Sequence, residues 1–197
     1  MSPRSSSAKQ ALRAQLTEAR RALRDDPQRK ALLDAALLKH TVSFLHDIGA
    51  QDSNIAAYNP LPTEPGADNF ADMLRAHARR VFVPLSLPDG VLAWAVQDDA
   101  PAAEGALGIS EPAGPRYTSR VLSSCGALIV PALGVDASGM RLGKGAGYYD
   151  RALSVTDAPT AAVVYDDNVV NAVPHDAHDV AVQAVITPSG WWWAERK

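Results

Sequence analysis

The sequence predicts a single α/β domain, residues 1–197, with an open, mainly parallel sheet and helices on both faces. Amphipathic helical segments alternate along the chain with short apolar runs of strand length. One of these runs, 127–130, is uninterrupted, as in a strand that is buried on both faces. A chain of 197 residues, 47% of them apolar, can bury a sizeable core, and no internal repeat or linker divides it.

Three helices are predicted in the first half of the chain. The first runs over 8–23, and Ser7 with Gln10 resembles a capping box at its start. Asp26 followed by Pro27 is typical of an N-cap and a first helical residue, which predicts a second helix that ends near residue 49. A third helix is expected over 68–79, where four side chains recur at helical spacing: Phe70, Met73, Leu74 and His77.

The strand signals are short apolar runs at 54–58, 81–85, 91–96, 127–130, 161–165 and 180–186. Loops are predicted at 59–65 and over the Pro/Gly-rich stretch 98–115, a helix at 148–153, and a chain end packed on the domain by Trp191 to Trp193. The strand order does not follow from the sequence. Ligands of open α/β sheets bind beyond the carboxyl ends of the strands, so we expect the site at 131–149, directly after the 127–130 strand.

The composition excludes several classes of partner. The net charge of -3 gives no basis for a nucleic-acid or membrane-surface partner. No run approaches the roughly 20 apolar residues of a membrane helix. The single cysteine, Cys125, allows no intrachain disulfide, and we expect a monomer in the cytoplasm. The basic, serine-containing N-terminus raises the possibility of a transit peptide, but the acidic residues Glu18, Asp25 and Asp26 argue against one.

The most unusual segment lies between Gly139 and Arg151. Gly143, Gly145 and Gly147 alternate with other residues in it, and a predicted helix follows. Glycines permit positive φ and close backbone approach, so successive N–H groups can surround an anion. Two basic side chains, Arg141 and Lys144, lie in the same turn. The segment therefore favours a polyphosphate ligand.

Two familiar phosphate-binding motifs do not fit this segment. A P-loop needs four residues between its first glycine and its Gly-Lys-[Ser/Thr] end, and here the spacing is one short and Gly145 replaces the hydroxyl residue. A dinucleotide fingerprint reads GxGxxG directly after a strand, whereas this spacing is GxGxG and the strand ends far upstream.

The same segment closely resembles the signature of the 5-formyltetrahydrofolate cyclo-ligase family in Val130-Pro131, Asp136, Gly139, Arg141 to Gly145 and Gly147 to Arg151. Weaker matches follow in the family's order along nearly the whole chain: Lys9 with Leu12-Arg13, Tyr58, Glu64, Gly108-Ile109 with Glu111-Pro112, Val173-Pro174, His178-Asp179 and Thr187. The chain departs from the family's pattern at three positions. Lys144 stands where arginine is common, Ala146 replaces a frequent glycine, and Asn168 stands where glutamine is usual.

The resemblance implies that the chain converts 5-formyltetrahydrofolate to 5,10-methenyltetrahydrofolate at the expense of ATP. In this chemistry ATP phosphorylates the formyl oxygen, N10 attacks to close the ring, and phosphate leaves. Mg²⁺ is the implied cofactor. The protein's part is mainly to position the reactants and to neutralise phosphate charge.

The resemblance also implies residue roles. Lys144, Arg141 and Tyr149 would be catalytic. ATP would contact Lys9, Arg13, Arg141, Leu142, Gly143, Lys144, Gly145, Ala146, Gly147, Tyr148 and Tyr149. Folate would contact Asn59, Glu64, Lys144, Gly145, Ala146, Gly147 and Tyr148. Asp150 and Asp179 would be the Mg²⁺ ligands, since that ion prefers hard oxygen donors.

Other interpretations of these residues are open. Lys9 and Arg13 are spaced as a solvated basic pair on a helix, and Asp150 has basic neighbours with which it could pair. A zinc site at His175, Asp176, His178 and Asp179 lacks a further cysteine or histidine. Among functions, a non-catalytic nucleotide- or folate-binding regulator and a sugar-phosphate isomerase compete with the ligase, the isomerase by analogy of fold alone.

Overall fold

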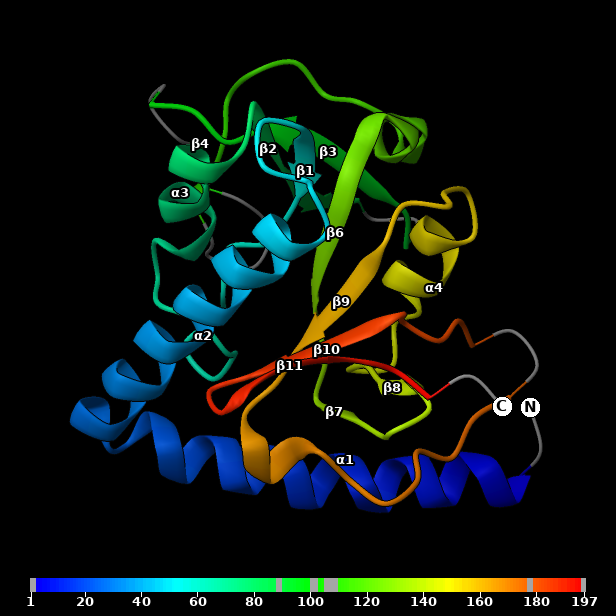
Figure 1. Ribbon diagram of the computed structural model, residues 1–197. Coiled ribbons are helices and arrows are strands. Elements are labelled where there is room, and N and C mark those ends of the chain that lie inside the picture. Colours follow the sequence, from blue (N-terminus) through cyan, green and yellow to red (C-terminus); the bar gives the residue numbers. More distant parts are fainter. Residues whose placement is uncertain (1–2, 88–89, 100–102, 105–109, 177–178, 196–197) are drawn as a thin grey trace.

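The computed structural model describes residues 3–87, 90–99, 103–104, 110–176 and 179–195. A seven-stranded sheet runs through it in the order β11-β10-β9-β6-β1-β2-β3 (Figure 1). Its members are β1 (Asn54–Ala56), β2 (Arg80–Ser86), β3 (Leu92–Val96), β6 (Cys125–Pro131), β9 (Thr160–Val163), β10 (Ala184–Thr187) and β11 (Gly190–Trp193). The five central strands pair in parallel, and the edge strands β3 and β11 pair antiparallel. The predicted mainly parallel sheet is confirmed.

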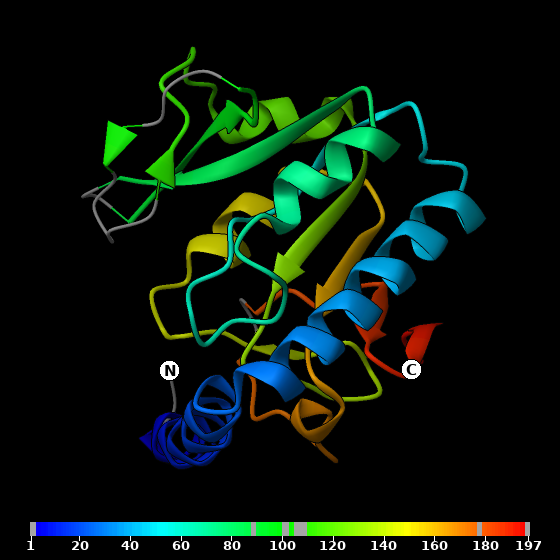
Figure 2. The same ribbon diagram turned by 90° about the vertical axis from the view of Figure 1, so that its left-hand side faces the viewer.

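Helices cover both faces of this sheet. The helices α2 (Pro27–Asp47) and α3 (Phe70–Leu74) lie over one face, as Figure 2 shows. Their apolar side chains, among them Leu37 and Phe44, form one buried cluster with strand residues such as Ile129. On the other face, the 3-10 helix η2 (Ser119–Ser124) and α4 (Tyr148–Leu153) cover a second buried cluster. Burial on both faces explains why the central strands read as uninterrupted apolar runs.

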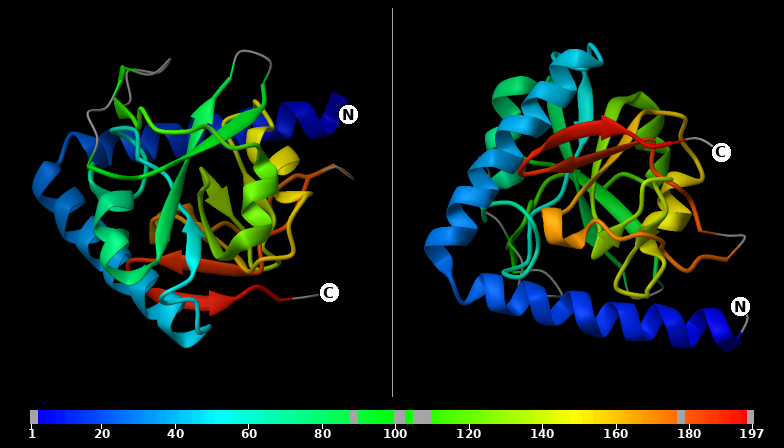
Figure 3. Two further views of the ribbon diagram at one scale, coloured as in Figure 1. Left: turned by 90° about the horizontal axis from the view of Figure 1, so that it is seen from above. Right: turned by 60° about the horizontal axis from the view of Figure 1, so that its bottom comes forward.

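The first helix, α1 (Pro3–Arg24), lies across one end of the domain and not on a sheet face (Figures 1 and 3). It is held there by Leu16, which packs with Leu142 and Val173 in a small separate cluster. Because α1 passes the segments that follow the strands, its buried side can present polar groups to the space beyond the strand ends.

Several boundaries differ from the sequence prediction. Helix α1 begins at Pro3, so Ser7 lies inside it and the predicted capping box is wrong. The Asp26 cap is confirmed, since its carboxylate accepts a hydrogen bond from Arg29 N at 3.1 Å. The third helix is a five-residue α3 followed by the 3-10 turn η1 (Arg75–His77), and Met73 is 40% exposed.

In the C-terminal half, the helix predicted at 148–153 matches α4, whereas the strand predicted at 180–186 is reduced to β10. The predicted 98–115 loop contains the two-residue strands β4 (Ala103–Glu104) and β5 (Ser110–Glu111), which pair antiparallel. Residues 100–102 and 105–109, including the Gly108-Ile109 match, lie outside the described residues. Strand β11 was not predicted, although its tryptophans do pack on the domain: the Trp191 ring lies 5.2 Å from that of Phe44.

Candidate functional site

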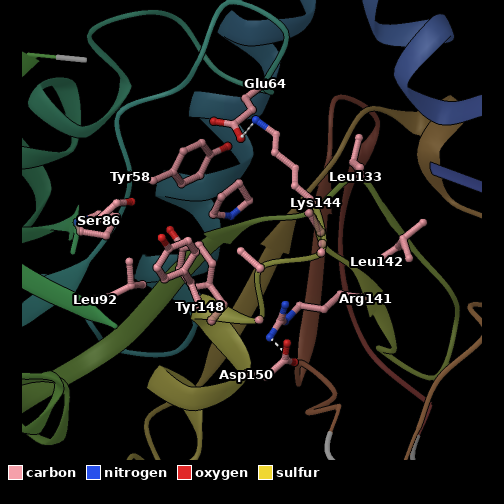
Figure 4. A pocket seen from close by; sticks show the side chains of 18 of the residues that line it. Tyr58, Glu64, Ser86, Leu92, Leu133, Arg141, Leu142, Lys144, Tyr148 and Asp150 are labelled. Carbon is pink, nitrogen blue, oxygen red and sulfur yellow. Dashed lines mark hydrogen bonds and ion pairs between the residues drawn. The ribbon is translucent and has the colours of Figure 1, made fainter. Parts of the chain in front are cut away.

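A cavity of about 820 Å³ opens beyond the carboxyl ends of β1, β2 and β6. Its walls come from α1, from the segment after β1, from Ala132 and Leu133 after β6, and from the glycine-rich segment before α4 (Figure 4). The position is the one expected for open α/β sheets. Six basic and three acidic side chains line it, although the whole chain carries a net charge of -3. Positive charge is thus concentrated where a ligand would lie, which favours an anionic ligand.

Every residue that the family resemblance proposed for the site lines this one cavity. The two ends of the set are 170 positions apart in the chain, yet Lys9 and Asp179 are in direct contact. Two ion pairs connect further members across the cavity, Lys144 with Glu64 and Arg141 with Asp150, and Figure 4 draws both. The structure therefore brings the predicted residues together; their individual roles remain proposals.

The glycine-rich segment is shaped by Asp136 and by backbone conformations that favour glycine. It begins in the hairpin of β7 (Gly134–Val135) and β8 (Arg141–Leu142). Asp136 Oδ1 accepts hydrogen bonds from Ser138 N at 3.0 Å and from Met140 N at 3.2 Å, and Oδ2 accepts one from Val173 N at 2.8 Å. A Cβ on Gly139 would lie 2.2 Å from the Val182 carbonyl oxygen, so no larger residue fits there.

Two more glycines of the segment, Gly145 (φ 110°) and Gly147 (φ 66°), have positive φ. Among the described non-glycine residues only Asp52 does, so Ala146 has an ordinary φ and replaces the family's glycine without strain. Arg13 fixes the segment from α1 by donating from Nε to the Gly143 carbonyl at 3.0 Å.

The basic residues at the cavity's inner end are paired with carboxylates. Lys9 Nζ lies 2.6 Å from Asp179 Oδ2 and 2.9 Å from Asp176 Oδ2. Burial lowers the pKa of Lys9, but the hydrogen bonds to Asp179 and Asp176 outweigh it and raise the pKa above its ordinary value. The ammonium group therefore stays charged at neutral pH.

Arg141 is buried, and its Nη2 donates to Asp150 Oδ1 at 2.7 Å. Burial lowers the pKa of its guanidinium, partly offset by the Asp150 carboxylate. Its Nε finds no hydrogen-bond partner among the described residues, although it is buried. A buried, unsatisfied donor is costly, and in a cavity wall it is a natural partner for a ligand oxygen.

The two tyrosines of the segment differ in their surroundings. Tyr148 Oη lies 3.5 Å from the Leu87 carbonyl, and the Arg151 guanidinium lies 5.8 Å from the centre of its ring. Burial, together with the Glu64 carboxylate, raises the pKa of Tyr149 well above its ordinary range. The Tyr149 hydroxyl is therefore protonated at neutral pH, and it can donate a hydrogen bond but cannot act as a base.

The backbone next to Asp179 lies beside Asp150, because the N–H of Val180 contacts Asp150 Oδ1 at 3.3 Å. Both aspartates are oxygen donors at the cavity wall, which suits Mg²⁺. The described residues contain no group of three or more histidine, cysteine or acidic side chains arranged to hold a metal ion. The two carboxylates thus fit an ion that takes its other ligands from phosphate oxygens and water. The zinc alternative loses support because His175, Asp176 and Asp179 form no such group of three; His178 lies outside the described residues.

Sequence reasoning missed Arg20. It lines the cavity with only 3% of its surface exposed. Its Nε donates to Asn168 Oδ1 at 3.1 Å, and its Nη2 donates to the Ala132 carbonyl. Burial lowers the pKa of its guanidinium, with small opposing effects from Tyr58 and Glu64. The sequence held a signal for Arg20, because Lys9, Arg13 and Arg20 fall on one face of α1. The hydrogen bond from Arg20 also gives Asn168 a role, as an acceptor that holds the guanidinium.

Fold and cavity together define an α/β protein with a cavity lined mainly by basic side chains, among its charged groups, at the carboxyl ends of its strands. A family model described as the 5-formyltetrahydrofolate cyclo-ligase family matches residues 5–188, and the chain belongs to this family. A 5-formyltetrahydrofolate cyclo-ligase of Mycolicibacterium smegmatis is 34% identical over 195 residues, which cover 95% of this chain and 96% of that one. The Escherichia coli K12 enzyme of the same name is 35% identical over 74 residues, 36% of this chain and 41% of that one.

Two solved structures share the fold. A 5,10-methenyltetrahydrofolate synthetase from Mycoplasma pneumoniae superposes with a TM-score of 0.71 at 24% identity, covering 91% of this chain and 98% of that one. The synthetase of Aquifex aeolicus gives a TM-score of 0.77 at 24% identity, covering 96% and 94% of the two chains. Among the described residues, no helix combines the length and apolar character needed to span a membrane.

Proposed function

We propose that this chain converts 5-formyltetrahydrofolate and ATP to 5,10-methenyltetrahydrofolate, ADP and phosphate. Family membership and the relative that matches nearly the whole chain support the reaction. The observation that carries the proposal is the cavity, which places the basic glycine-rich segment and the Glu64 loop around one space. The proposed roles are all assigned to residues of one chain, and the proposed active form is a monomer.

The triphosphate would lie against the glycine-rich segment and the basic face of α1. Lys9 and Arg13 approach from α1, and Arg141 and Lys144 from the segment itself. Each can exchange its present carboxylate or carbonyl partner for a phosphate oxygen. Arg141 also has its unpaired Nε, and guanidinium groups bind phosphates with two parallel hydrogen bonds.

Asp150 and Asp179 would hold Mg²⁺ together with phosphate oxygens, and the ion would neutralise charge on the phosphates. The contact of Val180 N with Asp150 Oδ1, one residue after Asp179, and the position of both aspartates in the cavity wall support this assignment. Asp150 also fixes Arg141, so its carboxylate links the metal position to a phosphate-binding side chain.

The folate would enter from the side of Glu64, with Asn59 and Tyr148 in the adjoining walls. Glu64 is 9% exposed, and it can accept hydrogen bonds from the amino group and ring N–H of a pterin. Its Oε1 lies 2.7 Å from Lys144 Nζ, so the folate-binding and phosphate-binding groups are in contact before chemistry begins. This contact supports a placement of the two substrates in which the formyl oxygen and the γ-phosphate meet near Lys144.

In the first step, the formyl oxygen forms a bond to the γ-phosphorus while the bond between that phosphorus and ADP breaks. Lys144 and Arg141 stabilise the charge on the transferred phosphoryl oxygens. N10 then attacks the activated carbon and loses its proton, and phosphate leaves with the former formyl oxygen. Tyr149 serves as a hydrogen-bond donor, because its raised pKa keeps the hydroxyl protonated.

The test is the appearance of methenyltetrahydrofolate, followed by its absorbance, when the purified chain is mixed with 5-formyltetrahydrofolate. We expect product only when both ATP and Mg²⁺ are present, with ADP formed in equal amount. Chelation of the metal should stop the reaction, and added Mg²⁺ should restore it. Binding of ATP without any turnover would overturn the proposal and favour a regulatory protein.

A further inference from the structure

The loop that carries Glu64 is irregular, yet side chains from α2, from the segment after β1 and from the segment after β9 contact its backbone. Three backbone groups of Pro65 and Gly66 form hydrogen bonds with Tyr58, Lys30 and Asp34, and the Tyr165 hydroxyl contacts the Glu64 carbonyl. Tyr165 Oη lies 3.3 Å from the Glu64 carbonyl, Tyr58 Oη 2.5 Å from that of Pro65, and Lys30 Nζ 3.1 Å from that of Gly66. Asp34 Oδ1 accepts from Gly66 N at 2.9 Å.

These side chains are also connected to one another. The Asp34 carboxylate, only 4% exposed, accepts from Tyr165 Oη at 2.7 Å and from Lys30 Nζ at 2.5 Å. Burial, with the Asp34 contact, raises the pKa of Tyr165 well above its ordinary range, so its hydroxyl keeps the donated proton. Lys30, Asp34 and Tyr165 thus form one buried network, which we name the loop clamp.

The loop clamp ends at the Glu64 carboxylate. The Glu64 Oε2 accepts from Leu61 N at 2.9 Å, which folds the side chain back over its own loop. Gly66 adds a steric constraint, because a Cβ there would lie 3.0 Å from the Phe70 ring. Because hydrogen bonds hold both the loop backbone and the Glu64 side chain, the Glu64 carboxylate faces the cavity in one orientation.

Stability alone does not explain such a network. Burying a carboxylate, an ammonium and a hydroxyl costs desolvation energy, and apolar side chains of similar volume often stabilise a protein as well or better. What a fully bonded polar network adds is a single local geometry. The three members of the loop clamp do not line the cavity, whereas Glu64 does, so any effect of the clamp on a ligand must pass through the Glu64 loop.

We propose that Lys30, Asp34 and Tyr165 are positioning residues that set the affinity for the folate by fixing the Glu64 carboxylate against the pterin ring. The proposal rests on the folate-binding role of Glu64 in the proposed function. Preorganisation of this kind removes the cost of ordering the loop when the folate binds. Phosphate binding is linked to Glu64 only through the pair with Lys144, a half-exposed side chain, so we expect a small effect on ATP.

The test is a double-mutant cycle on the full chain, with dissociation constants for 5-formyltetrahydrofolate and for ATP measured by calorimetry. Tyr165→Phe removes only the hydroxyl, and we expect it to weaken folate binding by about tenfold, since small displacements of a positioned group cost this much. ATP binding should stay within about twofold. In the Glu64→Gln background, the same Tyr165→Phe change should alter folate binding by no more than about twofold.

An equal loss of folate affinity in both backgrounds, or no loss in either, would overturn the proposal. If Tyr165→Phe lowers the folded fraction, Lys30→Met replaces it in a second double-mutant cycle with Glu64→Gln, because Lys30 is partly exposed. Thr41→Val is the matched control, because Thr41 is a fully buried residue of α2 whose Oγ1 donates to the Leu37 carbonyl at 2.8 Å, away from the loop. It should lower the unfolding temperature and leave folate affinity unchanged.

The unaltered chain separates the two proposals. If it does not bind 5-formyltetrahydrofolate, or binds it without turnover in the presence of ATP and Mg²⁺, the proposed function fails. If it turns over and the cycle is additive, only the role of the loop clamp fails.

Discussion

Replacing Glu64 with glutamine should affect the two substrates in opposite directions. Glu64 Oε1 and Lys144 Nζ are 2.7 Å apart, and the Lys144 side chain is 50% exposed. An ion pair with a partner this exposed is worth about 0–1 kcal/mol, so freeing Lys144 should tighten ATP binding by at most about fivefold. The folate instead loses a charged acceptor worth about 1.5–3 kcal/mol, which corresponds to a weakening of roughly 10- to 150-fold.

The assay measures each dissociation constant separately, by calorimetry or by protection against thermal unfolding. Glu18→Gln is the control, because Glu18 is an exposed acid on α1 that lies 3.5 Å from Arg21. It should change neither constant. Equal weakening of ATP and folate binding in Glu64→Gln would refute the reasoning, because it would mean that the substitution damages the cavity as a whole.

Three further predictions follow from the geometry. Lys144→Ala should lower kcat by about 100-fold or more, since transition-state charge loses its partner, while exposed Lys39→Ala in α2 should leave kcat unchanged. Arg20→Met leaves the Ala132 carbonyl and Asn168 Oδ1 without their donor, which should cost about 2 kcal/mol and lower the unfolding temperature by roughly 4–8 °C in a calorimetric scan. Burial raises the pKa of the Cys125 thiol to about 12, so alkylation of this thiol near pH 9 should be slow in the folded chain. The free energy of unfolding should fall as the pH rises from 9.0, the pKa of the thiol in the unfolded chain, toward 12, because over this range only the unfolded chain gains from forming the thiolate.

The architecture could be predicted because its signals are local. The uninterrupted apolar run 127–130 indicated a buried parallel strand, which β6 confirms, and the strand predicted at 161–165 is found as β9. The same logic overlooked β11. Its consecutive tryptophans show the alternation of a strand, since Trp191 packs on the α2 face of the sheet and Trp192 packs on the opposite face. The direction of the edge strands depends on connections that no local pattern encodes.

The residues that line the cavity could be proposed from the resemblance, but the contacts among them could not be predicted. The Lys144–Glu64 pair joins positions 80 residues apart, and the Tyr165–Asp34 hydrogen bond joins positions 131 residues apart. In the sequence, Tyr165 lies at the end of a predicted strand, and no role was predicted for Asp34. Only the packing of α2 against the sheet places both beside the Glu64 loop, so the loop clamp is a property of the tertiary structure.

The ion pairs of the cavity bear on which polyphosphate the site accepts. The basic groups proposed to bind phosphate lie beside carboxylates, as Lys9 does with Asp179 and Arg141 with Asp150. A bare triphosphate would take the basic partners and leave these partly buried carboxylates facing negative charge, which is costly. In the proposed function, a triphosphate that carries a divalent cation would satisfy both members of each pair, because its oxygens would take the basic side chain and its cation would be held by the carboxylate. Asp150 and Asp179 therefore act, in the proposed function, as selectors for the metal-complexed nucleotide.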